Sequence, residues 1–192
     1  FLWAHYGLFE EHTLVIMGRF DAERAVSLIE RYRVNWCYLV PTMMQRIAKL
    51  PNLRNRDLSS LDAIYHTAAP CPPWLKETWI ELLGPERVYE VYGSIENVGA
   101  AVIRGDEWLR HRGSVGRPFG CEVRIADPSG HPLPPGEIGE IFMHPLVSRP
   151  TYGYLGAPPG RATADGFVSV GDLGWLDPDG YLYLADRRVD LI

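Results

Sequence analysis

The first hundred residues alternate short apolar runs with amphipathic segments, and this alternation most restricts the folds open to the chain. Apolar runs at 35–40, 63–69 and 88–92 have the length and composition of buried strands. Segments with helical periodicity lie around them, at 21–32, 42–50 and 72–84. Strands that alternate with helices predict an α/β fold, in which a mostly parallel sheet carries flanking helices.

Local signals mark where these helices begin and end. Asp21 is a favourable N-cap residue for the first helix. Thr42 and Gln45 have the spacing of a capping box, which predicts a helix start at Thr42. The prolines at 72 and 73 suit the start of the last helix, and Gly84 suits its end.

After about Arg104 helical periodicity disappears and short strands separated by turn sequences rich in proline and glycine are expected. The expected strands are 122–126, 139–144, 166–170 and 181–185. This pattern predicts a small antiparallel sheet that resembles a barrel. We therefore expect an α/β subdomain over residues 1–104 and a small β subdomain over residues 105–192.

Composition excludes several classes of function. The 192 residues carry a net charge of −5 and show no basic stripe, so nucleic acid is not an expected partner. The three cysteines, Cys37, Cys71 and Cys121, are widely spaced and predict neither a disulfide framework nor a zinc site. They favour a reduced, cytoplasmic setting. No apolar run approaches the roughly 18 residues of a membrane span, so no transmembrane segment is expected.

The segment that follows the strand at 88–92 combines an aromatic ring, a glycine, a hydroxyl and a carboxylate. A planar base can stack on Tyr92, and Ser94 with the backbone near Gly93 can bind phosphate oxygens. Glu96 offers the carboxylate oxygens that Mg²⁺ prefers. The alternative interpretation is a strand, a turn and a solvated acid.

Two further charged residues follow later strands. Asp172 can accept hydrogen bonds from the vicinal diol of a ribose, and Arg187 can donate to a ribose hydroxyl or phosphate. The alternatives are an aspartate in an ordinary β-turn and a solvated charge cluster. His66 lies in an apolar strand, where a structural core histidine is an alternative to a functional one. The segment 136–140 is interpreted as a turn that enters a strand.

Taken in order, several segments resemble motifs of the adenylate-forming superfamily, which includes acyl-CoA synthetases, adenylation domains and beetle luciferases. The resemblance spans essentially the whole chain and rests on LVPTM at 39–43, LSSL at 58–61 with HTAAP at 66–70, YGSIE at 92–96, GSVGRP at 113–118, PGEIGEI at 135–141, and VGDLGWLD at 170–177 with DGYLYLADR at 179–187. Each motif alone is weak, but their common order is a strong signal.

The resemblance implies an ATP-dependent acyl-CoA ligase, which joins a carboxylic acid to AMP, releases pyrophosphate and passes the acyl group to coenzyme A. A fatty, aromatic or steroid-type acid fits equally, and a carrier-protein thiol is an alternative acceptor. Carried over to this sequence, the nucleotide-binding residues are Ala68, Ala69, Tyr92, Gly93, Ser94, Asp172 and Arg187. Glu96 is the implied catalytic residue and Mg²⁺ ligand, and the acyl group is implied to lie near His66, Asn97, Val98 and Gly99.

The sequence departs from the family pattern at four places. Ile95 and Val170 stand where the motifs have threonine, Thr67-Ala68 replaces a glycine pair, and Val189 occupies the hinge position. The family's phosphate loop and its C-terminal domain, each with a lysine, have no counterpart among these residues. We therefore expect a fragment that is inactive alone. A non-catalytic nucleotide- or acyl-binding module is the alternative, and a purely structural interaction domain is a third interpretation.

Overall fold

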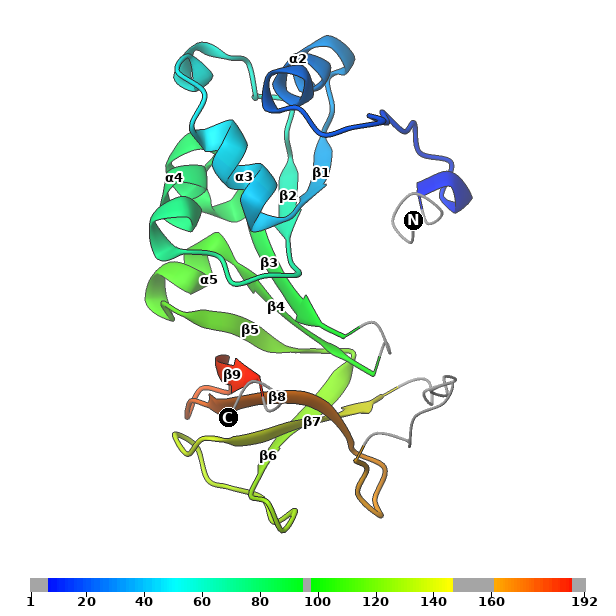
Figure 1. Ribbon diagram of the computed structural model, residues 1–192, viewed down its shortest axis with the longest axis vertical. Coiled ribbons are helices and arrows are strands. Elements are labelled where there is room, and N and C mark those ends of the chain that lie inside the picture. The colour runs from blue at the N-terminus through cyan, green and yellow to red at the C-terminus, as the bar shows by residue number, and fades with distance from the viewer. Residues whose placement is uncertain (1–6, 95–97, 147–160, 188–192) are drawn as a thin grey trace. The chain divides into compact units, whose positions relative to one another are not determined.

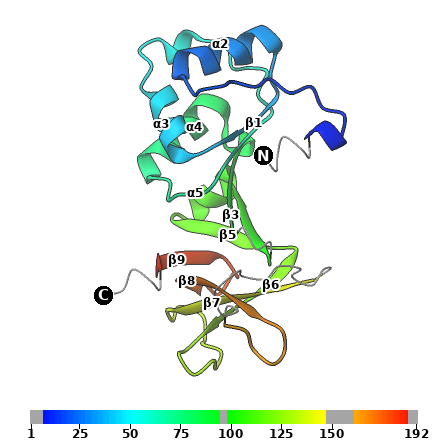
Figure 2. The same cartoon turned by 45° about the vertical axis from the view of Figure 1, so that its right-hand side comes forward.

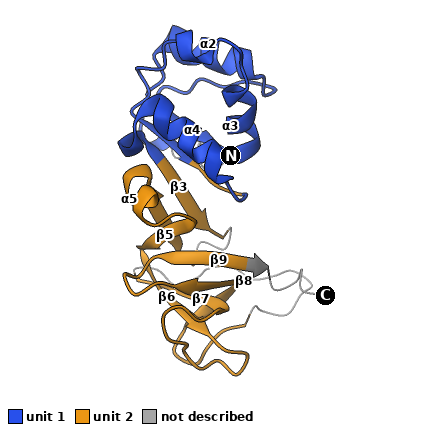
Figure 3. Ribbon diagram, turned by 90° about the vertical axis from the view of Figure 1, so that its left-hand side faces the viewer, with its two compact units in different colours: residues 1–65, 69–88 blue, residues 66–68, 89–192 orange. Residues whose placement is uncertain are grey.

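The computed structural model describes residues 7–94, 98–146 and 161–187 (Figure 1). The chain forms two compact units, which Figure 3 shows in separate colours. Unit 1 comprises residues 1–65 and 69–88, and unit 2 comprises residues 66–68 and 89–192. The chain therefore contributes three residues to unit 2 before it returns to unit 1.

Unit 1 packs helices against two neighbouring strands. Its elements are α2 (Ala22–Tyr32), β1 (Trp36–Leu39), α3 (Pro41–Ala48), the short 3₁₀ helix η1 (Leu53–Asn55), β2 (Ala63–His66, of which His66 belongs to unit 2), α4 (Pro73–Leu83) and η2 (Pro85–Arg87). Core side chains that are at most 1% exposed include Val26, Met44, Ile64 and Trp79. The indole Nε1 of Trp79 donates to the carbonyl of Met44 over 3.3 Å, which ties α4 to α3.

Two predicted helix limits are confirmed. Oδ1 of Asp21 accepts a hydrogen bond from the backbone N–H of Arg24 over 2.8 Å and so caps α2. Helix α4 begins at Pro73 and ends before Gly84, whose φ of 95° suits glycine.

The predicted capping box at Thr42 and Gln45 is wrong. Helix α3 begins one residue earlier, at Pro41, and the side chain of its N-cap residue Val40 makes no capping hydrogen bond. Proline is favourable at the first helical position because it has no N–H that would need a partner there.

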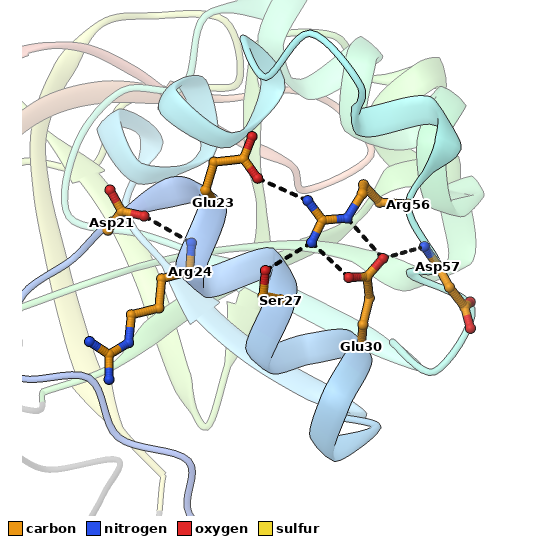
Figure 4. A network of polar contacts seen from close by, with 7 residues as sticks. All are labelled: Asp21, Glu23, Arg24, Ser27, Glu30, Arg56 and Asp57. Atoms are coloured by element: carbon orange, nitrogen blue, oxygen red, sulfur yellow. Dashed lines mark hydrogen bonds and ion pairs between the residues drawn. The ribbon is translucent and has the colours of Figure 1, made fainter.

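An ion-pair network joins α2 to the loop after η1 (Figure 4). The guanidinium of Arg56 donates to both carboxylate oxygens of Glu30 over 2.9 and 2.7 Å, to Glu23 over 2.9 Å and to Ser27 over 3.0 Å. The backbone N–H of Asp57 adds a hydrogen bond to Glu30. These bonds, chiefly the one from Arg56, hold the pKa of Glu30 below its ordinary value.

Unit 2 is dominated by strands. Its elements are β3 (Val88–Gly93, of which Val88 belongs to unit 1), β4 (Ala100–Arg104), α5 (Gly105–Arg110), β5 (Ser114–Phe119), β6 (Cys121–Ala126), β7 (Gly139–Pro145), β8 (Val168–Leu176) and β9 (Leu182–Arg187). The strand order is β3-β4-β5-β9-β8-β7-β6, and Figure 2 shows β9, β8 and β7 side by side. Core residues Ala101, Ile141, Met143 and Leu182 are fully buried.

The predicted α/β class is confirmed, with a difference in how the strands pair. The pairings from β3 to β9 are antiparallel, so the sheet is mostly antiparallel rather than mostly parallel. Within the described ranges the sheet does not close into a barrel, since β6 stands last in the strand order. The connections from β3 to β4 and from β8 to β9 are short, and short connections permit antiparallel neighbours but not parallel ones.

Three elements of unit 2 were not predicted: β4, α5 and β5. Helix α5 has only six residues, too few to show helical periodicity in the sequence. Its start is marked by Glu107, whose side chain accepts from the backbone N–H of Arg104 over 3.2 Å. The alternation in β4, where Ala101 and Ile103 are buried, is hidden because most of its residues are apolar.

The chain passes from one compact unit to the other between residues 65 and 66, 68 and 69, and 88 and 89. The subdomain boundary expected between residues 104 and 105 stays a prediction. No helix in the part of the chain that the structure describes is long and apolar enough to cross a bilayer.

Candidate functional site

Two residues singled out from the sequence, Tyr92 and Asp172, meet in unit 2. The hydroxyl of Tyr92, on β3, donates to Oδ2 of Asp172, on β8, over 2.6 Å. The cross-strand register then pairs Asp172 with Arg187 on β9. Tyr92 and Asp172, which are 80 residues apart in the sequence, are thus in direct contact. The backbone of Arg187 is paired with the backbone of Asp172.

Two glycines, Gly171 and Gly174, lie close to Asp172 in β8. Gly171 has a φ of 77°, and its N–H donates to the hydroxyl of Ser169 over 3.1 Å. At Gly174, where the register with β9 shifts, a Cβ would overlap the carbonyl oxygen of Tyr183. A larger residue would be strained by the positive φ at position 171 and would clash with the backbone of β9 at position 174.

Glu140, a buried acid that the sequence analysis did not single out, holds the hydroxyl of Ser169, which lies three residues before Asp172. Glu140 on β7 is 5% exposed, and its Oε1 accepts a hydrogen bond from Ser169 over 2.5 Å. Its Oε2 forms an ion pair with Arg161. Glu140 directly precedes the buried apolar residues 141–143, and a buried acid requires a partner. The segment 136–140 was interpreted only as a turn that enters a strand.

The residues that follow β2 in unit 2 differ in their exposure. His66 is fully buried. The hydroxyl of Thr67 donates to the carbonyl of Val91 over 2.5 Å, which fixes this short segment beside β3. Ala68 is exposed and has a φ of 71°, a left-handed conformation that glycine adopts more readily. Position 68 thus has a backbone suited to the glycine of the motif it resembles. Ala69, the other small residue predicted to lie near a base, is exposed and belongs to unit 1.

Strand β3 ends at Gly93, which is paired with Ala100 on β4. The hydroxyl oxygen of Ser94 is inaccessible to solvent and has no hydrogen-bond partner among the residues that the structure describes. A ligand oxygen that reached this hydroxyl would supply a partner.

The residues that complete the turn pack against the core. Val98 is 1% exposed and belongs to the main core cluster of unit 2. A Cβ at Gly99 would overlap the side chain of Cys121, so this position is closely packed. The predicted roles of Glu96 and Asn97 lie outside the described residues, as does the side chain of Arg187.

The family model of AMP-binding enzymes matches residues 1–149. A feruloyl-CoA synthase of an Amycolatopsis species is 38% identical over 186 residues, which cover 94% of this chain and 37% of that protein. The 4-coumarate–CoA ligase-like protein 6 of Oryza sativa subsp. japonica is 36% identical, over 94% of this chain and 31% of that protein.

A solved structure agrees with the sequence matches. The o-succinylbenzoate CoA synthetase of Bacillus subtilis, in complex with its acyl-adenylate intermediate, superimposes with a TM-score of 0.83 at 28% identity. The match covers 98% of this chain and 38% of that structure. The chain thus spans about a third of the length of these relatives. Since the family model covers most of its residues, the chain belongs to the family of AMP-binding enzymes.

Proposed function

We propose that the protein acts in ATP-dependent activation of a carboxylic acid as an acid–thiol ligase. A carboxylate oxygen of the acid attacks the α-phosphorus of ATP, and pyrophosphate leaves. The sulfur of coenzyme A then attacks the acyl carbon, a thioester forms, and AMP leaves. Family membership and relatives named as CoA ligases support this proposal. The observation that carries it for this chain is the contact between Tyr92 and Asp172.

In this proposal the Tyr92 ring stacks on adenine and Asp172 accepts hydrogen bonds from the ribose hydroxyls. A carboxylate has lone pairs for several donors, so Asp172 can accept from the Tyr92 hydroxyl and from a ribose diol together. The hydrogen bond from Tyr92 then fixes the carboxylate before the nucleotide arrives. Arg187, which the register places opposite Asp172, is proposed to assist at the ribose.

The remaining assignments follow the motifs. Ala68 and Ala69 are proposed to lie near adenine, and Gly93 and Ser94 near the α-phosphate. The buried hydroxyl of Ser94 supports its role, since a phosphate oxygen would give it a partner. Glu96 is the proposed Mg²⁺ ligand, and the ion would offset negative charge on the phosphates. The acyl group is proposed to lie near His66, Asn97, Val98 and Gly99.

A second candidate function for this 192-residue chain is nucleotide binding without turnover. Both lysines of the sequence, Lys49 and Lys76, belong to unit 1, so unit 2, which carries Tyr92 and Asp172, has none. Lys76 is also only 2% exposed on α4. With no lysine in unit 2 to take the role that the motif resemblance gives to lysine, we expect the chain to bind AMP but not to release pyrophosphate.

Calorimetric titration of AMP into the purified chain tests the site. Asp172→Asn should weaken binding about tenfold or more, because a charge-assisted hydrogen bond contributes roughly 1.5–3 kcal/mol. The matched control is Asp165→Asn, which removes a carboxylate of unit 2 that pairs with Arg124 at the surface, and it should bind AMP like the wild type. Equal affinity of the wild type and Asp172→Asn would contradict the proposed ribose contact.

Pyrophosphate release separates the two candidate functions. The chain is mixed with ATP, Mg²⁺ and a panel of fatty and aromatic acids. AMP binding without pyrophosphate release supports a binding role for these residues alone. Acid-dependent release would overturn the expected inactivity and support the ligase assignment directly.

A further inference from the structure

A second group of polar side chains lies in unit 2, at the turn between β8 and β9. His111 directly follows helix α5, and Asp177 and Asp179 lie in the turn. One ligand atom from each of these three residues lies within 4.8 Å of the others. The side chains of His111 and Asp177 are 18% and 12% exposed, whereas Asp179 is exposed. We propose that these three residues form a binding site for one divalent transition-metal ion such as Zn²⁺.

Two of the three side chains are held in place by their surroundings. The imidazole of His111 stacks on the ring of Tyr181, with centroids 3.7 Å apart and planes inclined by 18°. Nδ1 of His111 lies 3.2 Å from Oδ2 of Asp177. The other oxygen of Asp177 accepts from the backbone N–H groups of Asp179 and Tyr181 over 3.0 and 2.8 Å. A metal ion would therefore find an oriented imidazole nitrogen and an oriented carboxylate oxygen.

The hydroxyl of Tyr183 donates over 3.3 Å to Oδ2 of Asp177, the oxygen that lies near Nδ1 of His111. Hydrogen bonds of this kind to a ligating carboxylate orient it for a metal ion.

The donor set indicates the class of metal. One imidazole nitrogen with two carboxylates suits Zn²⁺, whereas Mg²⁺ prefers oxygen ligands alone. Zn²⁺ requires ligand atoms about 2.0–2.2 Å from the ion, so the three groups must approach one another slightly. The exposed side chain of Asp179 is free to rotate toward the other two. The two carboxylates also match the charge of a divalent ion.

This site is separate from the contact between Tyr92 and Asp172. Along the hairpin of β8 and β9, Asp172 is paired with Arg187 at the open end, and Leu176 is paired with Leu182 next to the turn. Asp177 is five residues beyond Asp172, a distance of about 16 Å along an extended strand. The proposed metal is therefore not the Mg²⁺ of the proposed ligase reaction, and the proposal stands if that function is disproved.

Titration calorimetry with zinc chloride on the 192-residue chain tests the site. The wild type should bind one Zn²⁺ in a saturable manner, and His111→Ala and Asp179→Asn should each weaken that binding about tenfold or more. Asp179→Asn changes no side-chain contact described above, so it remains informative if His111→Ala, which loses the Tyr181 stack, does not fold. The cysteines are the same in all variants, and any thiolate binding is therefore common to them.

The chain offers a matched control in His131. Its Nδ1 lies 3.4 Å from Oδ2 of Asp127, a histidine–aspartate pair in the same unit that is more exposed than His111 and Asp177. No third ligand group accompanies this pair among the described residues. His131→Ala should retain wild-type Zn²⁺ binding. The proposal is overturned if the wild type shows no saturable binding, if Asp179→Asn binds Zn²⁺ like the wild type, or if excess Mg²⁺ displaces the bound ion.

Discussion

Unit 1 and unit 2 are stabilised by different means. Unit 1 depends on large side chains packed between helices, with Trp79 of α4 bonded to the backbone of α3. Unit 2 depends on an antiparallel sheet whose course requires glycine: among the described residues it contains eight glycines with positive φ, whereas unit 1 contains one. Asp172 lies between two of the glycines of unit 2, Gly171 and Gly174. We therefore expect substitutions at glycines to disturb unit 2 more than losses of side-chain volume do.

The largest expected effect tests the backbone of unit 2. Gly116 has a φ of 110°, and a Cβ there would overlap the carbonyl of Val102. Gly116→Ala should lower the free energy of unfolding by about 5 kcal/mol or more, or prevent folding of unit 2. Gly120, with a φ of 68° and open space around its Cβ position, is the matched control, for which we expect a loss of about 1–2 kcal/mol. Urea unfolding measures both, and equal losses would contradict this account.

A smaller effect tests the packing of unit 1. Trp79 is 1% exposed, so Trp79→Ala should cost about 3–5 kcal/mol. Trp74, at the start of the same helix, is 46% exposed, and Trp74→Ala should change stability by no more than about 0.5 kcal/mol. Hydrogen exchange followed by mass spectrometry should show that Trp79→Ala weakens protection mainly in unit 1. Equal weakening in both units would remove the distinction between them.

The smallest effect concerns the ion pairs of unit 1 and their dependence on pH. Arg56→Ala should lower the urea midpoint at pH 7, since it removes the partner that holds the pKa of Glu30 down. A carboxyl with a lowered folded pKa contributes stability above its unfolded pKa, about 4.5, and loses that contribution as the pH falls through the folded value. The difference between Arg56→Ala and the wild type should therefore shrink below about pH 4.5.

The control for this series is Arg54→Ala. Arg54 and Glu81 form a pair in which both side chains are well exposed, and such pairs contribute little. Its urea midpoint should match that of the wild type across the pH range. A pH-independent effect of Arg56→Ala would show that packing, rather than the carboxylates, accounts for its role.

Elements with strong local signals were predictable, and elements without them were not. The cap at Asp21 and the stop at Gly84 mark α2 and α4 in the sequence, and the structure has both. Helix α3 starts at Pro41 rather than at Thr42. Two start signals are adjacent here, a proline suited to the first helical position and the capping-box pattern at Thr42, and the helix begins at the proline. The six-residue helix α5 and the apolar strand β4 have patterns too short or too uniform to recognise.

The same distinction applies to the candidate site. The order of its motifs identified Tyr92 and Asp172 as residues of interest. Their contact over 2.6 Å depends on pairing between strands far apart in the chain, which no local pattern encodes. Glu140 was missed because its importance comes from Ser169 and Arg161, which lie 29 and 21 residues away in the sequence.

The sequence by itself determined the α/β class, the family and the residue types available for chemistry, because periodicity, capping and motif order are local properties of the chain. Only the tertiary structure decided which strands pair, which acid is buried, and which aspartate meets Tyr92 and which meets His111. Those outcomes depend on contacts between distant residues, whose free energies arise only when the whole sheet has formed.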